Sequence, residues 1–158
     1  MSANTKKLSV VFVAASFFLL DRLVKLLFLN YYFRETFRLV GDWLQLQLAL
    51  NSGIAFSLPL PSWLIIGVSV MIIITLINVC WWSYQREEVL KFTAWLFLTQ
   101  GALSNLIDRW HYGAVVDYFG VKYFTIFNLA DVAITLSIVY LLLKVMSTGP
   151  TKPVDTNA

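Results

Sequence analysis

The stretch LPLPSWLIIGVSVMIIITLINVCWWSY, residues 58–84, contains no charged side chain and decides the class of this protein. A helix needs about 20 predominantly apolar residues to cross the hydrocarbon core of a bilayer, and this stretch is long enough to do so with some tilt. The whole chain has the same character, because 59% of its 158 residues are hydrophobic and 13% are charged, whereas soluble domains carry about 25% charged residues. An aromatic content of 16% suits side-chain belts at both membrane surfaces. We therefore predict an integral membrane protein.

Three further apolar stretches surround this one, at residues 8–28, 92–107 and 123–143. The first resembles a cleavable signal peptide, but Asp21, Arg22 and Lys25 stand where a small-residue cleavage site would lie. We therefore expect it to be retained as a helix. The stretches predict an all-α membrane protein with transmembrane helices at about 8–28, 62–84, 89–108 and 124–146, in one integral membrane domain of residues 1–146 followed by a disordered cytoplasmic tail at 147–158.

The connection between the first two helices, at about 29–60, follows a different pattern. Residues 43–48, WLQLQL, alternate apolar and polar side chains, which favours a short half-buried strand or hairpin over another span. Asn51, Ser52 and Gly53 follow as a turn signal. We predict a small β-rich segment here, at the membrane interface on the extracytoplasmic side.

The distribution of basic residues favours one orientation modestly. One side would carry Lys6, Lys7, Arg86, Lys91, Lys144 and Lys152, and the other Arg34, Arg38, Arg109 and Lys122. The larger set favours the cytoplasm, which places both termini there. With four alternating spans, the unusual polar residues then share the extracytoplasmic face: Asp21, Asn51, Asp108, Asp117, Asn128 and Asp131.

Three aspartates of that face, Asp108, Asp117 and Asp131, are the candidates for chemistry. A carboxylate near the bilayer core costs at least about 2.5 kcal/mol unless it is paired or hydrated, so such residues are functional candidates by default. Several of them joined by one short loop suggest paired-carboxylate chemistry. The single Cys80 excludes an internal disulfide and a cysteine-rich metal site, and the single His111 disfavours a histidine-built zinc centre. A net charge of +3 without a basic stripe gives no support to nucleic-acid binding.

Five short motifs occur in order along nearly the whole chain. They are Asp21 with Lys25, Asn51-x-Gly53-x-Ala55, Gly101-x-x-x-Asn105-x-x-Asp108-Arg109, Val115-Val116-Asp117, and Phe127-Asn128-x-Ala130-Asp131. Each motif is weak alone, but the set, in this order and at these helix ends, resembles the lipoprotein signal peptidase family (signal peptidase II, prolipoprotein signal peptidase), the intramembrane aspartyl proteases of bacteria. Two features depart from the family. Ser104 stands where glycine is usual, which would loosen a close helix contact, and the interval between Asp117 and Asp131 is short.

The resemblance implies that Asp117 and Asp131 are the catalytic pair. Two carboxyls that share a site do not both ionise readily, so one holds a proton while the other activates the water that attacks the scissile carbonyl. The resemblance further implies supporting or substrate-binding roles, without a metal or other cofactor, for Asp21, Lys25, Asn51, Gly53, Asn105, Asp108, Arg109, Asn128 and Ala130.

The implied substrates are prolipoproteins that carry a diacylglyceryl-modified cysteine, and cleavage just before that cysteine releases the signal peptide. The implied location is the bacterial cytoplasmic (inner) membrane, with a monomeric, multi-pass enzyme among membrane lipids and its active site near the extracytoplasmic face.

Two supporting roles stay open at this point. Arg109 is expected to pair with Asp108 and hold the loop that carries Asp117, or to contact substrate carbonyls. Asp21 and Lys25 lie four residues apart on one helical face, in the favourable orientation for an ion pair. That pair either fixes the first helix in the bundle or contacts the substrate or phospholipid head groups.

Each residue also has a simpler interpretation. Asp131 alone would be a helix-capping residue, Asp117 a solvated loop acid, and Gly101 and Ser104 small residues at a close helix contact. The main alternative function is a small membrane carrier or proton-coupled transporter that uses the aspartates as a relay, and a third is a non-enzymatic assembly factor. A relay needs groups spread across the bilayer, and these acids gather at one face, so the sequence favours the peptidase.

Overall fold

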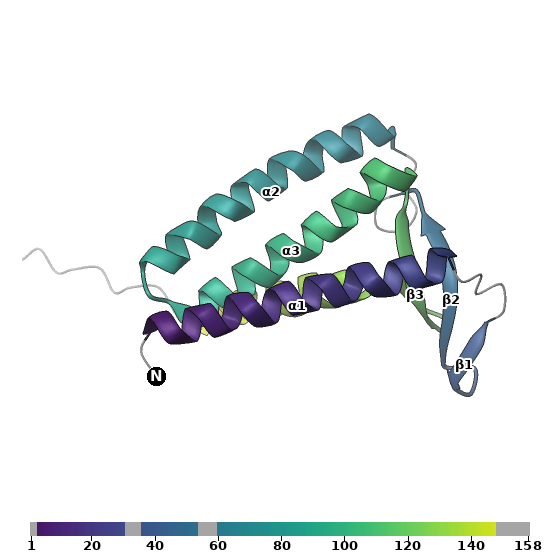
Figure 1. Cartoon of the computed structure of the whole chain (residues 1–158), viewed down its shortest axis with the longest axis horizontal. Coiled ribbons are helices and arrows are strands. Elements are labelled where there is room, and N and C mark those ends of the chain that lie inside the picture. The colour runs from purple at the N-terminus through teal and green to yellow at the C-terminus, as the bar shows by residue number, and fades with distance from the viewer. Residues whose placement is uncertain (1–2, 31–35, 54–59, 148–158) are drawn as a thin grey trace, which may run out of the picture.

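The computed structural model of the chain describes residues 3–30, 36–53 and 60–147. The helices lie together, and a small sheet lies across one end of them (Figure 1). The start of α1 lies at the opposite end (Figure 1). α3 contacts each of the other three helices. The elements are α1 (Ala3–Asn30), β1 (Phe37–Val40), β2 (Leu44–Asn51), α2 (Ser62–Gln85), α3 (Val89–Tyr112), β3 (Val115–Val121), β4 (Ile126–Phe127) and α4 (Leu129–Ser147).

The sheet is antiparallel and has the strand order β1-β2-β3-β4. Its central pairing places Ala49 of β2 opposite Asp117 of β3, and Asn51 opposite Val115. The predicted β-rich segment is therefore present, but it is only half of the sheet. The other half comes from the connection between α3 and α4, so two loops that are distant in sequence are held side by side. Residues 31–35 and 54–59 of the predicted segment and 148–158 of the predicted tail lie outside the described residues.

Three predicted helix boundaries are wrong. The first helix was expected from about 8 and begins at Ala3. The fourth helix was expected from about 124 and begins at Leu129, because the preceding residues form β3, a turn and β4. The sequence VVDYFGV of β3 lacks the alternating pattern of a strand because most of its residues are buried regardless of the face they point to. The third helix runs one turn past its expected end to Tyr112, where Gly113 ends it in the left-handed conformation with a φ of 71°.

The outer surface of the helices is apolar. Large side chains such as Phe12 of α1, Trp63 of α2 and Met146 of α4 are more than two-thirds exposed, at 72%, 75% and 79%. Among the described helices, α2 and α4 are long and apolar enough to cross a membrane, and 17% of each span is buried inside the protein. α1 and α3 carry charged side chains that point inward, as described below. Apolar side chains outside and charged ones inside suit a protein whose solvent is lipid.

Small residues let α3 approach α4 closely, as expected for Gly101. A Cβ at Gly101 would lie 2.7 Å from the backbone oxygen of Ala130 and 2.8 Å from Cγ1 of Ile134. Ser104 does not merely loosen such a contact, because its hydroxyl donates a hydrogen bond of 2.6 Å to Oδ2 of Asp21 on α1. The departure from glycine at this position therefore adds a polar link between α1 and α3.

That link belongs to a buried ion cluster that joins α1 to α3, made of Asp21, Arg22, Lys25 and Asp108. Nζ of Lys25 lies 2.7 Å from Oδ2 of Asp108 and 3.1 Å from Oδ2 of Asp21. Arg22 pairs with the other oxygen of Asp108. The side chains of Asp21, Lys25 and Asp108 are almost completely buried. Two acids and two bases balance in charge, which is the condition under which ionised groups can be buried together.

We expect Asp108→Asn to destabilise the protein strongly, because it leaves Lys25 and Arg22 short of negative charge in a buried place. Removing one partner of a buried pair costs about 3–5 kcal/mol. Thermal or denaturant unfolding of the purified protein in detergent measures the change. The matched control is Asp42→Asn, which breaks the exposed pair with Arg38 and should cost less than about 1 kcal/mol. Equal midpoints for the two variants would contradict the structural role of the cluster.

Candidate active site

Asp117 and Asp131 meet at the sheet end of the helices, although they come from different elements. Asp117 lies in β3, and Asp131 lies in the first turn of α4. One residue, Asn128, contacts both. Its side-chain Nδ2 donates to Oδ1 of Asp117 at 2.7 Å, and its backbone N–H donates to Oδ2 of Asp131 at 3.2 Å. The two carboxylates therefore share one asparagine as a hydrogen-bond donor.

Asn128 also sets where α4 begins. Its Oδ1 accepts a hydrogen bond of 2.9 Å from the backbone N–H of Asp131, while the carboxylate of Asp131 accepts from the N–H of Asn128. This reciprocal pair across three residues is a capping box, which satisfies backbone donors that the first helical turn leaves free. The capping interpretation of Asp131 is thus correct, and the cap holds its carboxylate against the same asparagine that binds Asp117.

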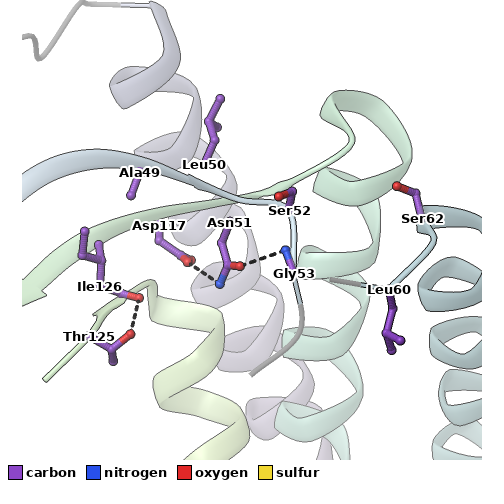
Figure 2. A pocket seen from close by; sticks show the side chains of 10 residues that line it. All are labelled: Ala49, Leu50, Asn51, Ser52, Gly53, Leu60, Ser62, Asp117, Thr125 and Ile126. Atoms are coloured by element: carbon purple, nitrogen blue, oxygen red, sulfur yellow. Dashed lines mark hydrogen bonds between the residues drawn. The ribbon is translucent and has the colours of Figure 1, made fainter. Parts of the chain in front are cut away.

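A second amide side chain holds each carboxylate. Nδ2 of Asn105 donates to Oδ1 of Asp131 at 2.8 Å. Nδ2 of Asn51 donates to Oδ2 of Asp117 at 3.3 Å, and Oδ1 of Asn51 accepts from the N–H of Gly53 at 3.2 Å (Figure 2). All four carboxylate oxygens therefore accept a hydrogen bond, and every one of these donors is neutral.

Cations approach the two carboxylates without pairing with them. Among the described residues, neither Asp117 nor Asp131 has an ion pair. Lys25 reaches the site through Asn105, to whose Oδ1 it donates at 2.9 Å. Arg109 is close enough to both acids to interact with them electrostatically, and it donates to the carbonyl of Gly53 at 3.5 Å. Negative charge at the pair is therefore only partly balanced.

This environment favours a protonated carboxyl. Burial raises the pKa of Asp117 from its ordinary value to about 6, and the negative charge of Asp131 adds to the rise. Hydrogen bonds from Asn128 and Asn51 and the charge of Lys25 act in the opposite direction. Because its pKa is raised, Asp117 keeps its proton up to a higher pH than an exposed aspartate does.

Two cavities meet at Asp117. The larger, of about 910 Å³, reaches both carboxylates, and Arg109 is its basic lining residue. The smaller, of about 500 Å³, lies on the side of Ser52 and Ser62 (Figure 2). Four residues line both cavities: Asn51, Asp117, Thr125 and Ile126. The rest of the wall of the larger cavity is mostly apolar and includes Phe124, Phe127, Val132 and Leu136. An extended peptide that crosses the junction would pass directly over the carboxylate of Asp117.

Asp108 and Ala130, also singled out in the sequence, link the elements that carry the pair to α3 and α1. Asp108 accepts a hydrogen bond of 3.2 Å from the N–H of Val116, and so holds the strand that carries Asp117. Ala130 takes part through its backbone N–H, which donates to Asp21 at 3.2 Å. One of the two roles expected for Arg109, an ion pair with Asp108, is wrong, because Lys25 and Arg22 pair with that carboxylate.

The open question about Asp21 and Lys25 has an answer in the structure. Both side chains are buried, and they pair with each other at 3.1 Å. They therefore fix α1 in the bundle and do not face lipid head groups.

Three contributing residues were not singled out as site residues. Arg22 pairs with Asp108, Ser104 binds Asp21, and Tyr118 donates from its hydroxyl to Asp21 at 3.1 Å. The signal for Tyr118 was its place beside Asp117, since a buried tyrosine hydroxyl normally has a hydrogen-bond partner. The signal for Arg22 was its place between two charged residues in an otherwise apolar helix.

Solved structures support the fold. The chain superposes with a TM-score of 0.77 on a bacterial membrane enzyme solved by the in meso method at 2.3 Å resolution. The match covers 92% of this chain and 94% of the other, at 24% sequence identity. A second bacterial membrane enzyme, solved by the same method at 1.9 Å, superposes with a TM-score of 0.76 at 21% identity, over 89% of this chain and 94% of that chain.

Sequence comparison gives the family. The chain is 35% identical to the lipoprotein signal peptidase of Syntrophomonas wolfei, over 83% of this chain and 88% of that protein. It is 34% identical to the lipoprotein signal peptidase of Helicobacter pylori, over 91% of this chain and 92% of that protein. The sequence model of the family described as signal peptidase (SPase) II matches residues 13–147. The chain therefore belongs to the signal peptidase II family.

Proposed function

We propose that this chain removes the signal peptide from bacterial prolipoproteins, as an intramembrane aspartyl endopeptidase that cleaves just before a diacylglyceryl-modified cysteine. Relatives named lipoprotein signal peptidase, matched along most of the chain, support the removal of signal peptides. One observation carries the aspartyl mechanism. Asp117 and Asp131 share Asn128 as a donor and line one cavity, and neither has an ion-pair partner among the described residues.

In the proposed mechanism, the pair starts with one proton between its two carboxyls. The ionised carboxyl takes a proton from water as the water oxygen attacks the scissile carbonyl, and the protonated carboxyl polarises that carbonyl and then donates to the departing amine. The raised pKa of Asp117, about 6, supports proton retention by the pair near neutral pH. The pair titrates as a unit, so the resting proton is not assigned to either residue.

Substrate contacts are proposed for the groups that border the pair. Arg109 lines the larger cavity and carries several N–H donors, which suit peptide carbonyls. Asn51 and Gly53 line the smaller cavity and offer side-chain and backbone groups to the peptide on that side. Val132 and Leu136 carry the apolar wall of the larger cavity along α4, and Leu136 is 65% exposed on the outer face. A lipid-anchored substrate would enter sideways along this wall.

We further propose that all four helices span the bacterial cytoplasmic (inner) membrane, with both termini in the cytoplasm and the sheet at the extracytoplasmic surface. α1 and α3 would tolerate the bilayer because the buried ion cluster of Asp21, Arg22, Lys25 and Asp108 points into the bundle. The proposed enzyme is a monomer among membrane lipids, comprises residues 1–146 and uses no cofactor.

The carrier function is less well supported. The buried acids Asp21, Asp108 and Asp117, with the half-buried Asp131, gather near the sheet. A proton relay needs groups spread across the bilayer. Substrate cleavage by the purified protein, without any transmembrane gradient, separates the two functions.

The proposed function predicts that purified protein converts a diacylated prolipoprotein to the shorter product, and that Asp117→Asn and Asp131→Asn each abolish this conversion. Asparagine keeps the size of aspartate but does not exchange protons, and loss of acid–base catalysis costs about 100- to 10,000-fold. A gel shift of the precursor measures cleavage, and unfolding midpoints verify that the variants are folded. Asp42→Asn, on the exposed rim of the sheet, is the control. Comparable cleavage by Asp117→Asn or Asp131→Asn would refute the aspartyl mechanism.

The pH profile should report the raised pKa of Asp117. Activity is expected to fall on the alkaline side as the pair loses its last proton, with a midpoint at or above about 6. Asn51 donates to the ionised form of Asp117 and so lowers this pKa. Asn51→Ala should therefore raise the pKa and move the alkaline limb to higher pH, as well as slow turnover. An alkaline limb that stays in place, or moves to lower pH, would show that Asp117 does not titrate in the active pair.

The proposed chemistry also predicts which reagents leave the enzyme active. Metal chelators, serine-directed reagents and thiol reagents that modify Cys80 should not change turnover, because water attack at a carboxyl pair needs none of these groups. Turnover of the diacylated precursor before and after treatment measures this. Inhibition by a chelator that is reversed by added metal would overturn the assignment.

A further inference from the structure

Tyr118 is buried beside the active pair, but it lines neither cavity. Its side chain is fully buried, and its ring stacks on that of Phe28 with 5.1 Å between ring centroids. It follows Asp117 directly in β3, and successive side chains of a strand point to opposite faces. Asp117 therefore faces the cavities while Tyr118 faces α1. Tyr118 is not among the residues that line either cavity.

The hydroxyl of Tyr118 joins three elements. It donates to Oδ1 of Asp21 on α1 at 3.1 Å and accepts from the backbone N–H of Leu129 at 3.0 Å. Leu129 is the first residue of α4, where backbone N–H groups have no acceptor within the helix. The next N–H, of Ala130, also donates to Oδ1 of Asp21, and the third, of Asp131, donates to Asn128. Each of the first three amides of α4 is thus held by a side chain, and Tyr118 takes the first.

We propose that Tyr118 is a positioning residue of the peptidase, whose hydroxyl fixes the first turn of α4, and with it Asp131, relative to Asp117. The proposal rests on the proposed function for the reaction that it serves. Burial raises the pKa of Tyr118 far above its usual range, and the neighbouring charge of Asp21 adds to the rise. The hydroxyl therefore keeps its proton and donates to Asp21 at every pH at which the enzyme works.

Tyr118→Phe tests the hydroxyl alone, because it keeps the ring on Phe28. A misplacement of about 1 Å at a reacting centre can cost about 100-fold in rate. For the loss of one positioning contact we expect kcat to fall about tenfold while KM stays within about twofold, since the substrate contacts are unchanged. The assay is cleavage of a purified diacylated prolipoprotein by the purified full-length chain.

The pH profile supplies a readout that a general loss of stability would not move. Asp117 is influenced by Asp131 of α4, Lys25 of α1 and Arg109 of α3. The negative charge of Asp131 raises the pKa of Asp117. If Tyr118→Phe lets Asp131 move away, that pKa falls and the alkaline limb of kcat shifts to lower pH.

Leu129→Pro removes the same hydrogen bond from the other side. Proline lacks the N–H that donates to Tyr118, and the first position of a helix accepts proline well. It should give the same pattern of lower kcat and nearly unchanged KM. The hydrogen bond that Leu129→Pro removes is already lost in Tyr118→Phe, so Leu129→Pro should cause no further loss of kcat when added to Tyr118→Phe. This second variant keeps the test decisive if Tyr118→Phe is poorly folded.

Tyr140→Phe is the matched control, since it removes a tyrosine hydroxyl from α4 far from the pair, and it should match the wild type. Wild-type kcat, KM and pH profile in Tyr118→Phe or Leu129→Pro would overturn the proposal. So would losses that multiply in the double variant, or a loss confined to KM. If the wild-type chain itself fails to cleave the precursor, the proposed function fails. A cleaving wild type with an equally active Tyr118→Phe refutes the positioning role alone.

Discussion

The ammonium group of Lys25 is the constraint on which the rest of the structure depends. It is fully buried and contacts carboxylates from two helices, Asp21 at 3.1 Å and Asp108 at 2.7 Å. A buried cation is stable only where such partners are held in place. The same two carboxylates accept backbone N–H groups of Val116 and Ala130. Charge balance between α1 and α3 thus places both the strand that carries Asp117 and the helix that carries Asp131.

The proposed active pair, Asp117 and Asp131, differs from this cluster in the charge of its surroundings. Asp21 and Asp108 contact cations, whereas the oxygens of Asp117 and Asp131 accept from asparagine side chains and a backbone N–H. A cation in direct contact would favour two ionised carboxylates and remove the shared proton. Neutral donors orient the oxygens without that effect. The protein therefore uses ion pairs in the supporting cluster and neutral donors at the proposed active pair.

The sequence predicted the helices, because long apolar runs are local signals. Its resemblance to the family singled out both carboxylates of the proposed pair. It did not predict β3 or β4, since a strand buried on both faces lacks alternation and its pairing with β2 is set by tertiary contact. It also offered the adjacent Arg109 as one possible partner of Asp108, whereas the partners come from α1, more than 80 residues away. Ion-pair partners across helices depend on packing, which a single sequence does not encode in its spacing.

In the proposed reaction, water activated by Asp117 and Asp131 cleaves the peptide bond before a lipidated cysteine. The most direct measurement is cleavage of a diacylated precursor in ¹⁸O-labelled water, with both products analysed by mass spectrometry. We expect a mature product that begins at the lipidated cysteine, one ¹⁸O atom in the new carboxyl group of the signal peptide, and no covalent enzyme–peptide adduct during turnover. Cleavage at another bond, or an acyl-enzyme adduct that forms and decays with turnover, would contradict it.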